Sequence, residues 1–155
     1  MTDYCIITDS TSDLTPELVE YLGIDVLPMD FIMDEITYHH YPDSHELNER
    51  IFYQSLRDGK TSKTMQISMG MFIEYFEKYL KENKDVLYIS FSSALSGTYS
   101  SACSAVKELE KVYKDNKVIV VDSKCASMGM GLLVYNAAEK KKDGLTIDEL
   151  AEWVT

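Results

Sequence analysis

The sequence predicts an α/β fold, a three-layer α/β/α domain with a mostly parallel β-sheet. Short apolar runs of strand length, rich in β-branched residues, recur along the chain. Segments whose apolar residues have helical spacing alternate with these runs. The 155 residues are enough for one domain with a buried core. Because such alternation favours parallel strands with helices on both faces, we expect a single domain over residues 1–155.

Clear boundary signals mark the first strand and the first helix. Residues 4–8 are a short β-branched run that ends in the polar sequence DSTSD, which is typical of a buried strand. A helix is predicted to follow, with Thr15 as its N-cap, Pro16 at its first position and Gly23 at its end.

Two extended segments and a second helix are predicted next. The extended segments cover residues 24–31 and 35–41. A helix is predicted to begin at Asp43, because Asp43 and Glu46 have the spacing of a capping box, and to stop near Gly59. The apolar residues that recur at helical intervals in it are Leu47, Ile51, Phe52 and Leu56.

The second half of the chain alternates more regularly. A last helix is predicted where Thr146 and Glu149 again have the spacing of a capping box. Before it, strands are predicted over residues 85–91 and 117–123, and helices over residues 69–83, 99–113 and 127–142.

The charge balance and the cysteines exclude several classes of function. Fifteen basic and twenty-six acidic residues give a net charge of -11, which opposes binding to nucleic acid or to an anionic membrane. The three cysteines have no CxxC spacing, so neither a disulfide framework nor a zinc site is indicated. No apolar run is long enough to cross a bilayer. We therefore expect a cytoplasmic protein with reduced thiols, without membrane insertion or a nucleic-acid partner.

Hydroxyl-rich turns follow the three clearest strands. They cover residues 9–13, 92–98 and 122–127. In open parallel sheets ligands bind in the crevice beyond the carboxyl ends of the strands. The three turns are therefore expected to converge on one ligand-binding edge.

The middle turn predicts a site for an anion. Ser96, Gly97 and Thr98 lie where a helix begins, so free backbone N–H groups and the positive end of the helix join the side-chain hydroxyls. Ordinary helix capping by serine and threonine is the competing interpretation.

Apolar residues, many of them methionines, lie in or beside these turns. Methionine side chains adapt to apolar ligands of variable shape, although they also fill cores. An anion site beside an adaptable apolar wall predicts an amphiphilic ligand with an acidic head group. The residues are Met65, Met69, Met71, Phe72, Phe91, Leu95, Met128 and Met130.

Four motifs carry a resemblance to a known family: IITDSTSDL, GKTSKTMQISMGMF, ISFSSALSGTYSSA and VIVVDSKCASMGMG. In order and spacing, over nearly the whole chain, they resemble the N-terminal domain of the DegV family, bacterial fatty-acid-binding proteins that work with a fatty acid kinase. The resemblance implies that the chain holds a long-chain fatty acid by its carboxylate and presents it to the kinase. It implies no cofactor and no chemistry by the chain itself.

The resemblance also implies which threonine binds the carboxylate. The family motif Lys-Thr-Ser-Gln matches the sequence KTMQ, which assigns the head group to Thr64. The alternative register assigns it to Thr61. The register that assigns the head group to Thr64 is preferred because Gln66 and Phe72 then also match the family pattern. Met65 stands where the family has serine, which removes one hydroxyl contact.

In the third motif the resemblance implies Ser96 as a further ligand of the carboxylate. Ser93 and the Gly97 amide are expected to be supporting donors. The residues expected to line the acyl chain are Met65, Phe91, Leu95 and Met128. The residues expected to order the turns without touching the ligand are Asp9, Ser10 and Asp122.

Members of this family continue for roughly another domain, whereas this chain ends at ELAEWVT. We therefore expect a fragment that lacks the C-terminal domain of the family. By the resemblance, that domain would supply the other wall of the acyl tunnel.

A small-molecule α/β enzyme is the alternative hypothesis, either a serine hydrolase or a phosphate-binding protein that uses Ser96. Against it, Ala94 and Thr98 stand where the GxSxG elbow has glycines. The sequence GMGLLV lacks the third glycine of a dinucleotide fingerprint. The candidate bases for a catalytic triad with Ser96 are His39, His40 and His45. The same histidines could be metal ligands, but the adjacent pair, His39 and His40, lacks the usual spacing of metal ligands.

Overall fold

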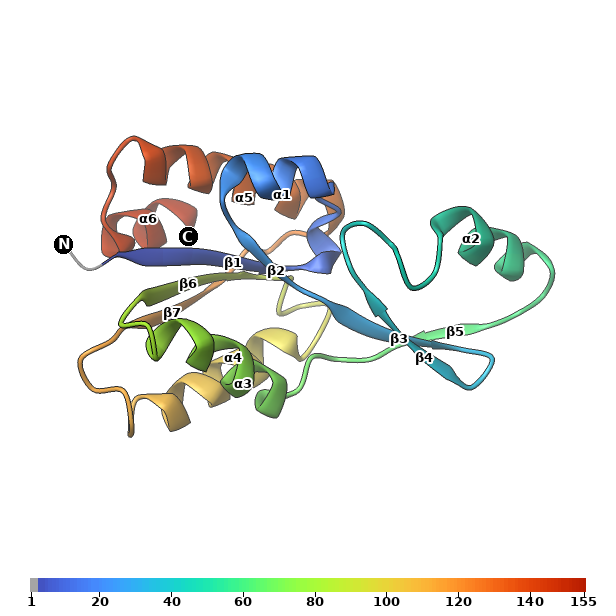
Figure 1. Cartoon of the computed structure of the whole chain (residues 1–155), viewed down its shortest axis with the longest axis horizontal. Coiled ribbons are helices and arrows are strands. Elements are labelled where there is room, and N and C mark those ends of the chain that lie inside the picture. The colour runs from blue at the N-terminus through green and yellow to red at the C-terminus, as the bar shows by residue number, and fades with distance from the viewer. Residues whose placement is uncertain (1–2) are drawn as a thin grey trace.

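The computed structural model describes residues 3–155, and its centre is a four-stranded parallel sheet (Figure 1). The strand order is β2-β1-β6-β7, and all three pairings are parallel. This confirms the predicted α/β fold. The strands are β1 (Tyr4–Asp9), β2 (Asp25–Leu27), β6 (Asp85–Ser90) and β7 (Val118–Asp122).

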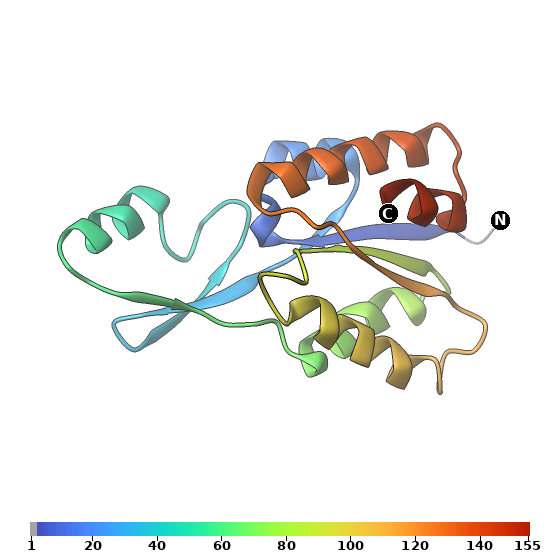
Figure 2. The ribbon, with the colours of Figure 1, turned by 180° about the vertical axis from the view of Figure 1, so that it is seen from behind.

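Helices cover both faces of this sheet, as Figures 1 and 2 show. One face carries α1 (Pro16–Leu22), α5 (Ser127–Lys142) and α6 (Ile147–Val154). The other carries α3 (Met69–Leu80) and α4 (Thr98–Leu109). The predicted three layers are therefore present.

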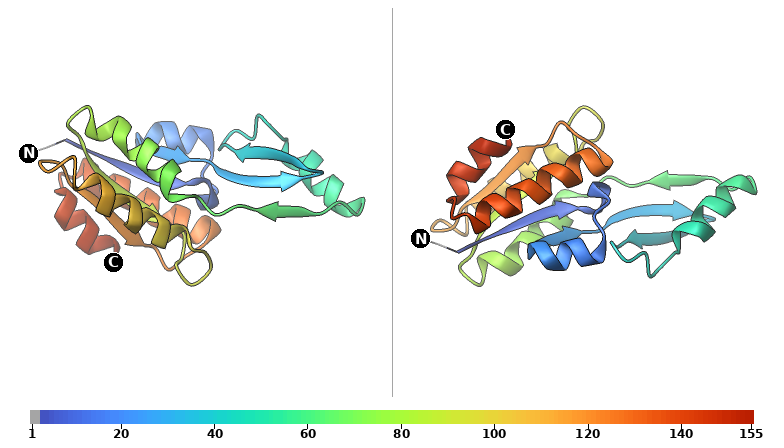
Figure 3. Two further views of the ribbon diagram at one scale, coloured as in Figure 1. Left: turned by 90° about the horizontal axis from the view of Figure 1, so that it is seen from below. Right: turned by 90° about the horizontal axis from the view of Figure 1, so that it is seen from above.

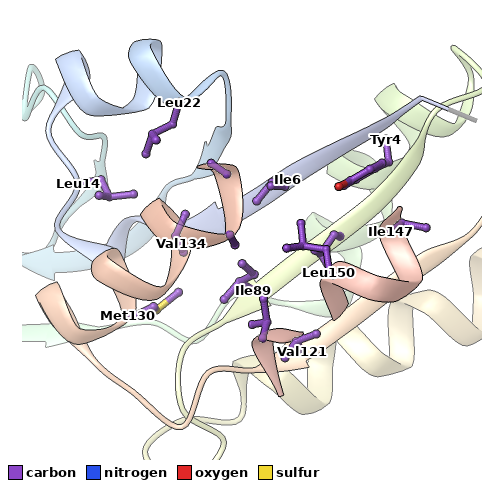
Figure 4. Close-up of a cluster of buried hydrophobic side chains, with 14 residues drawn as sticks. Tyr4, Ile6, Leu14, Leu22, Ile89, Val121, Met130, Val134, Ile147 and Leu150 are labelled. Carbon is purple, nitrogen blue, oxygen red and sulfur yellow. The ribbon is translucent and has the colours of Figure 1, made fainter. Parts of the chain in front are cut away.

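Alternate residues of the central strands build two cores, one on each face. Ile6 and Ile89 join the cluster beneath α1, α5 and α6, where Figure 4 shows them facing Val134 and Leu150. Ile7 and Tyr88 belong to the cluster beneath α3 and α4. All six residues of β6 are buried, so this strand is the centre of the domain. Strands buried on both faces are typical of parallel sheets and explain the continuous apolar runs in the sequence.

The predicted boundary signals of α1 and α6 are confirmed. Thr15 caps α1 by accepting a hydrogen bond from a backbone N–H, and Gly23 ends α1 in the left-handed conformation. Thr146 and Glu149 form the predicted capping box of α6. The helices α3 and α4 end earlier than the sequence predicted, at Leu80 and Leu109.

Beyond the carboxyl edge of the sheet the chain builds a second unit, which we call the arm (residues 29–64). Figure 3 shows it projecting from the three layers. Its sheet is antiparallel, in the order β4-β3-β5. Pro28 separates β2 from β3, so one extended segment leaves the parallel sheet and enters the antiparallel one. The arm contains β3 (Met29–Met33), β4 (Ile36–His40), α2 (Glu49–Arg57) and β5 (Ser62–Thr64).

The predicted start of the helix in the arm is wrong. The helix α2 begins six residues after Asp43, with Asn48 as its N-cap. Both members of the expected capping box are hydrogen-bonded elsewhere. Asp43 Oδ1 lies 2.6 Å from the ring Nδ1 of His45, and Glu46 accepts a 2.6 Å hydrogen bond from the His39 N–H. The helix does stop before Gly59, as predicted.

The short helix η1 (Ser10–Ser12) follows β1 and allows a first test of stability. Ser12 is fully buried, and its hydroxyl has no hydrogen-bond partner among residues 3–155. Ser12→Ala is expected to raise the free energy of unfolding by about 1 kcal/mol, because a buried polar group without a partner is destabilising. Urea unfolding followed by circular dichroism measures the change.

Ser10→Ala is the matched control for this substitution. Ser10 is also buried, but its Oγ accepts a 3.0 Å hydrogen bond from the Met29 N–H. Losing this acceptor is expected to lower the free energy of unfolding by about 1 kcal/mol. Equal losses in the two variants would contradict the assignment of the Ser12 hydroxyl as unpaired.

Candidate functional site

The candidate site lies at the carboxyl edge of the parallel sheet, where the strand order changes direction. From β1 the chain goes to β2 on one side, whereas β6 and then β7 lie on the other. Such a switch point opens the crevice in which α/β proteins bind ligands. The turns after β1, β6 and β7 meet here, as predicted. The Ser92 N–H donates to the Cys125 carbonyl at 3.1 Å, and the Ser123 N–H donates to the Ser90 carbonyl at 3.1 Å.

Asp9 joins the turns after β1 and β6. It is fully buried at the end of β1. Its carboxylate accepts hydrogen bonds from the Tyr88 hydroxyl at 2.6 Å, the Thr11 N–H at 3.1 Å and the Phe91 N–H at 3.4 Å. Burial, with Asp9 beside it, raises the pKa of Tyr88 well above its usual value, so this phenol stays a donor. These contacts fit the expectation that Asp9 orders the turns.

Ser93 is held by Asp122 at the end of β7. The Ser93 hydroxyl donates to Asp122 Oδ2 at 2.5 Å, and its N–H donates to Oδ1 at 3.1 Å. Burial acts to raise the pKa of Asp122, but hydrogen bonds from Ser93 and from the Lys124 N–H outweigh it and lower the pKa. The one hydroxyl proton of Ser93 is therefore committed to Asp122. To donate to a ligand, Ser93 would first have to release this carboxylate.

Ser96 caps the first turn of α4 and is still half-buried at the crevice. Its Oγ accepts a hydrogen bond from the Thr98 N–H at 3.2 Å and lies 3.0 Å from Thr98 Oγ1. Thr98 is buried, whereas Gly97 is exposed and contributes no side-chain cap. Ser96 therefore supports the start of α4 from the position before the N-cap, whereas the N-cap itself, Gly97, makes no side-chain cap bond. These bonds use the lone pairs of the Ser96 oxygen and leave its proton for a ligand when Thr98 is the donor between the two hydroxyls.

Thr64 lies at the end of β5, where the arm returns to the three layers. It pairs with Phe31 of β3, and its side chain is exposed. Two residues later, the side chain of Gln66 reaches the start of α4, where its Nε2 donates to Ser101 Oγ at 2.6 Å. Thr61 is also exposed, but it precedes β5. The side chain of Gln66 therefore connects the segment that contains Thr64 to the first turns of α4, which directly follow Ser96 and Gly97.

Three of the four residues expected to line an acyl chain present apolar surface to solvent. Met65 is 42% exposed, Leu95 is 66% exposed and Met128 is 53% exposed. Phe91 is instead half-buried against the core beneath α5 and α6. Met130, also beside the turns, is fully buried and fills this core. Met130 therefore belongs to the core, whereas Met65 and Met128 are exposed.

A cavity of about 450 Å³ lies between the arm and the turn after β1. A volume of this size is typical of small-molecule sites. Thr64 is on its wall, whereas Ser93, Ser96 and Gly97 are not, so the predicted head-group residues are not gathered in this cavity. The remaining wall residues are Ser10, Asp13, Leu14, Thr15, Pro16, Met29, Phe31, His40, Pro42, Ser44, Leu47, Glu49, Phe52, Tyr53 and Ser62.

The three histidines all lie in the arm. Asp30 Oδ1 is 2.6 Å from Nδ1 of His39, and this hydrogen bond raises the pKa of His39. His45 pairs with Asp43, and His40 is on the wall of the cavity. Over residues 3–155 no imidazole is hydrogen-bonded to Ser96, and no group of three or more acidic, histidine or cysteine residues could hold a metal ion.

All three cysteines are free thiols. Within residues 3–155, no helix combines the length and apolar character that a bilayer-spanning segment needs.

Comparison with known proteins gives consistent matches along the chain. A family model described as "Uncharacterised protein, DegV family" matches residues 4–155. A DegV domain-containing protein of Clostridium perfringens is 44% identical over 154 residues, which cover 99% of this chain and 53% of that protein.

Two solved structures are similar in fold. A fatty-acid-binding DegV family protein from Thermus thermophilus has a TM-score of 0.84 at 30% identity, over 99% of this chain and 52% of that one. A stearic-acid-binding protein from Eubacterium ventriosum has a TM-score of 0.87 at 25% identity, over 97% of this chain and 52% of that one. The chain thus spans about half the length of the relatives it matches.

Proposed function

Since the chain belongs to the DegV family, we propose that it is a fatty-acid-binding protein that holds a long-chain fatty acid by its carboxylate at the carboxyl edge of the sheet. Relatives of similar fold bind fatty acids, stearic acid among them. The chain itself does no chemistry in this proposal. It presents the bound acid to a fatty acid kinase, as the family resemblance implies. Its cytoplasmic location stays a prediction.

One observation supports the proposal: the hydroxyl-rich turns after β1, β6 and β7 meet at the carboxyl edge of the sheet, and Leu95 and Met128, in or next to these turns in the chain, are exposed. Thr64, Ser96 and the Gly97 N–H are the proposed ligands of the carboxylate, with Ser93 as an auxiliary one. Hydroxyl and amide donors bind a carboxylate without a cation, which suits a chain with a net charge of -11. The proposed acyl contacts are Met65, Phe91, Leu95 and Met128.

The proposed acyl contacts explain why three large apolar side chains are exposed to solvent. Met65, Leu95 and Met128 are large apolar residues that are exposed to solvent. A contiguous exposed apolar patch beside polar groups is typical of binding sites, and the three side chains form such a patch in this proposal. Burying a chain of methylene groups contributes about 0.8 kcal/mol for each group, so affinity is expected to rise with acyl length.

No observation favours the enzyme hypothesis. Ser96 is bonded only to Thr98 among the described side chains, and no base is placed to activate it. A phosphate-binding protein would require affinity for a small phosphate that does not depend on acyl length.

Thr64→Ala and Ser96→Ala are expected to weaken the binding of hexadecanoate about tenfold each. A hydrogen bond to a charged group contributes about 1.5–3 kcal/mol, and 1.4 kcal/mol corresponds to a factor of ten. Titration with fatty acids of increasing length, together with native mass spectrometry and lipid extraction of the purified protein, measures this.

Thr61→Ala is the matched control, because Thr61 is also an exposed threonine and belongs to the alternative register. Loss of binding in this variant, with Thr64→Ala unchanged, would move the head group to Thr61. A protein that ignores fatty acids of every length would contradict the proposed function. A full-length relative is measured in parallel. A loaded relative beside an empty chain would also contradict the proposed function for this chain, and would indicate that the acyl tunnel needs both halves of the family architecture.

A further inference from the structure

Gly97 occupies a position where its own backbone does not require glycine. It is the N-cap of α4 with φ -75° and ψ 0°, a conformation open to any residue. Serine, threonine, asparagine and aspartate are favoured at N-caps because their side chains accept a backbone hydrogen bond. Gly97 provides no such bond. The space around it provides a further reason for glycine at this position.

The side-chain amide of Gln66 fills that space. A Cβ on residue 97 would lie 2.3 Å from Gln66 Oε1, 2.8 Å from Cδ and 2.9 Å from Nε2. All three distances are shorter than real Cβ contacts allow. Any larger residue at position 97 would displace the Gln66 amide.

A second contact fixes the same amide one helical turn further along α4. Gln66 Nε2 donates to Ser101 Oγ at 2.6 Å, while the Ser101 N–H donates to the Gly97 carbonyl at 3.0 Å. The amide therefore lies along the first turn of α4, in contact with Gly97 and bonded to Ser101. The residue before Gln66 is bonded to the arm: the Met65 N–H donates to the Asp30 carbonyl at 2.8 Å.

We propose that Gln66 is a positioning residue for the fatty-acid head group: its amide, seated on Gly97 and Ser101, fixes Thr64 of the arm relative to Ser96 at the sheet edge. The inference rests on the proposed function. Thr64 and Ser96 belong to different units of the fold, so neither unit alone sets the separation of their hydroxyls. Because hydrogen-bond strength falls steeply with distance and angle, a carboxylate shared by both hydroxyls needs that separation to be fixed.

Gln66 and Gly97 are expected to act as one unit in a double-mutant cycle. Gln66→Ala removes the amide, and Gly97→Ala displaces it. Each substitution is expected to weaken hexadecanoate binding about tenfold, and the double variant should be no weaker than either single one. Affinity for 1-hexadecanol, which has the same chain without the carboxylate, should stay within about twofold. A residue that only supports the fold would change both affinities together.

Two further variants complete the test. Gln54→Ala is the matched control, because Gln54 is an exposed glutamine of α2 whose amide donates to Asp58, and it should change neither affinity. Ser101→Ala removes one of the two contacts of the Gln66 amide without touching the segment that bears Thr64, and a smaller loss is expected for hexadecanoate alone.

Additive losses from Gln66→Ala and Gly97→Ala would overturn the inference, as would an equal loss for hexadecanoate and 1-hexadecanol. In either case the protein without substitutions binds hexadecanoate, so the proposed function stands. If the protein without substitutions binds no fatty acid, the proposed function fails, and the positioning role of Gln66 fails with it.

Discussion

Replacing Asp9 by alanine is expected to lower the free energy of unfolding by about 3–4 kcal/mol, a large part of the stability of a domain of this size. The substitution leaves the Tyr88 hydroxyl and the Thr11 and Phe91 N–H groups without their acceptor. Tyr88 and Asp9 are both fully buried, so water does not replace the lost bond without entering the core. Urea unfolding followed by circular dichroism measures the loss.

Two controls separate the carboxylate from its surroundings. Tyr88→Phe removes one donor and keeps the acceptor, so a loss of about 1 kcal/mol is expected. Asp122→Ala removes an aspartate that also accepts three hydrogen bonds but is more exposed than Asp9. Water can replace the lost acceptor for these donors, so a smaller loss of stability is expected than for Asp9→Ala. A loss below about 1 kcal/mol in Asp9→Ala would show that the buried carboxylate does not hold the two turns together.

The second large effect is expected from Gly131→Ala in α5, a destabilisation of about 2 kcal/mol. A Cβ at this position would lie 2.5 Å from the backbone carbonyl oxygen of Ser12. Backbone atoms cannot rotate away as a side chain does, so η1 would have to move off α5. Because η1 directly follows Asp9, the displacement would also disturb the turn at the crevice.

Gly129→Ala provides a control two residues earlier in the same helix. The nearest atom to a Cβ at this position would be Cys125 Cβ at 3.8 Å, an ordinary contact. Alanine is favoured over glycine inside a helix, so this variant is expected to gain about 0.5–1 kcal/mol. Thermal and urea unfolding of the two variants should give changes of opposite sign. A gain in Gly131→Ala would mean that the close approach of η1 and α5 is not tight.

The sequence predicted the three layers well because each signal there is local and agrees with the packing. The apolar runs of β1, β6 and β7 fit a sheet buried on both faces, and the caps at Thr15 and Thr146 act within one helical turn. Consistent local and long-range preferences make such elements predictable.

The arm was predicted poorly because its signals are ambiguous. Asp43 and Glu46 have the spacing of a capping box, yet both bind other partners in the fold. The hairpin between β3 and β4 turns at Asp34 and Glu35, which both have positive φ. Asp34 suits such a turn, but glycine is the usual residue at the second position, where this sequence has Glu35, so the hairpin signal is incomplete. The three polar residues of β5 show no strand periodicity.

At the candidate site, the chain order of strands and turns was enough to predict where the hydroxyl groups gather, but not how they are paired. That the Ser93 proton is held by Asp122 depends on two neighbouring strands. The contact between Gln66 and Gly97 joins the arm to α4, and no local pattern reports it. A glycine at a helix start, where serine or threonine is also favoured, is a signal in the sequence that could have indicated it.

The pairing of β1 with β6 also has a consequence for folding kinetics. Thr8 and Ile89 are hydrogen-bonded neighbours although they lie 81 positions apart in the chain. Closing a loop of this length costs conformational entropy before any contact compensates for it, so pairings between distant strands form slowly. The turns after β1 and β6 meet only once the two strands are paired, so the candidate site forms after this step. A nascent or partly folded chain therefore has no site to occupy, and a ligand that binds the crevice selects molecules that have completed this step.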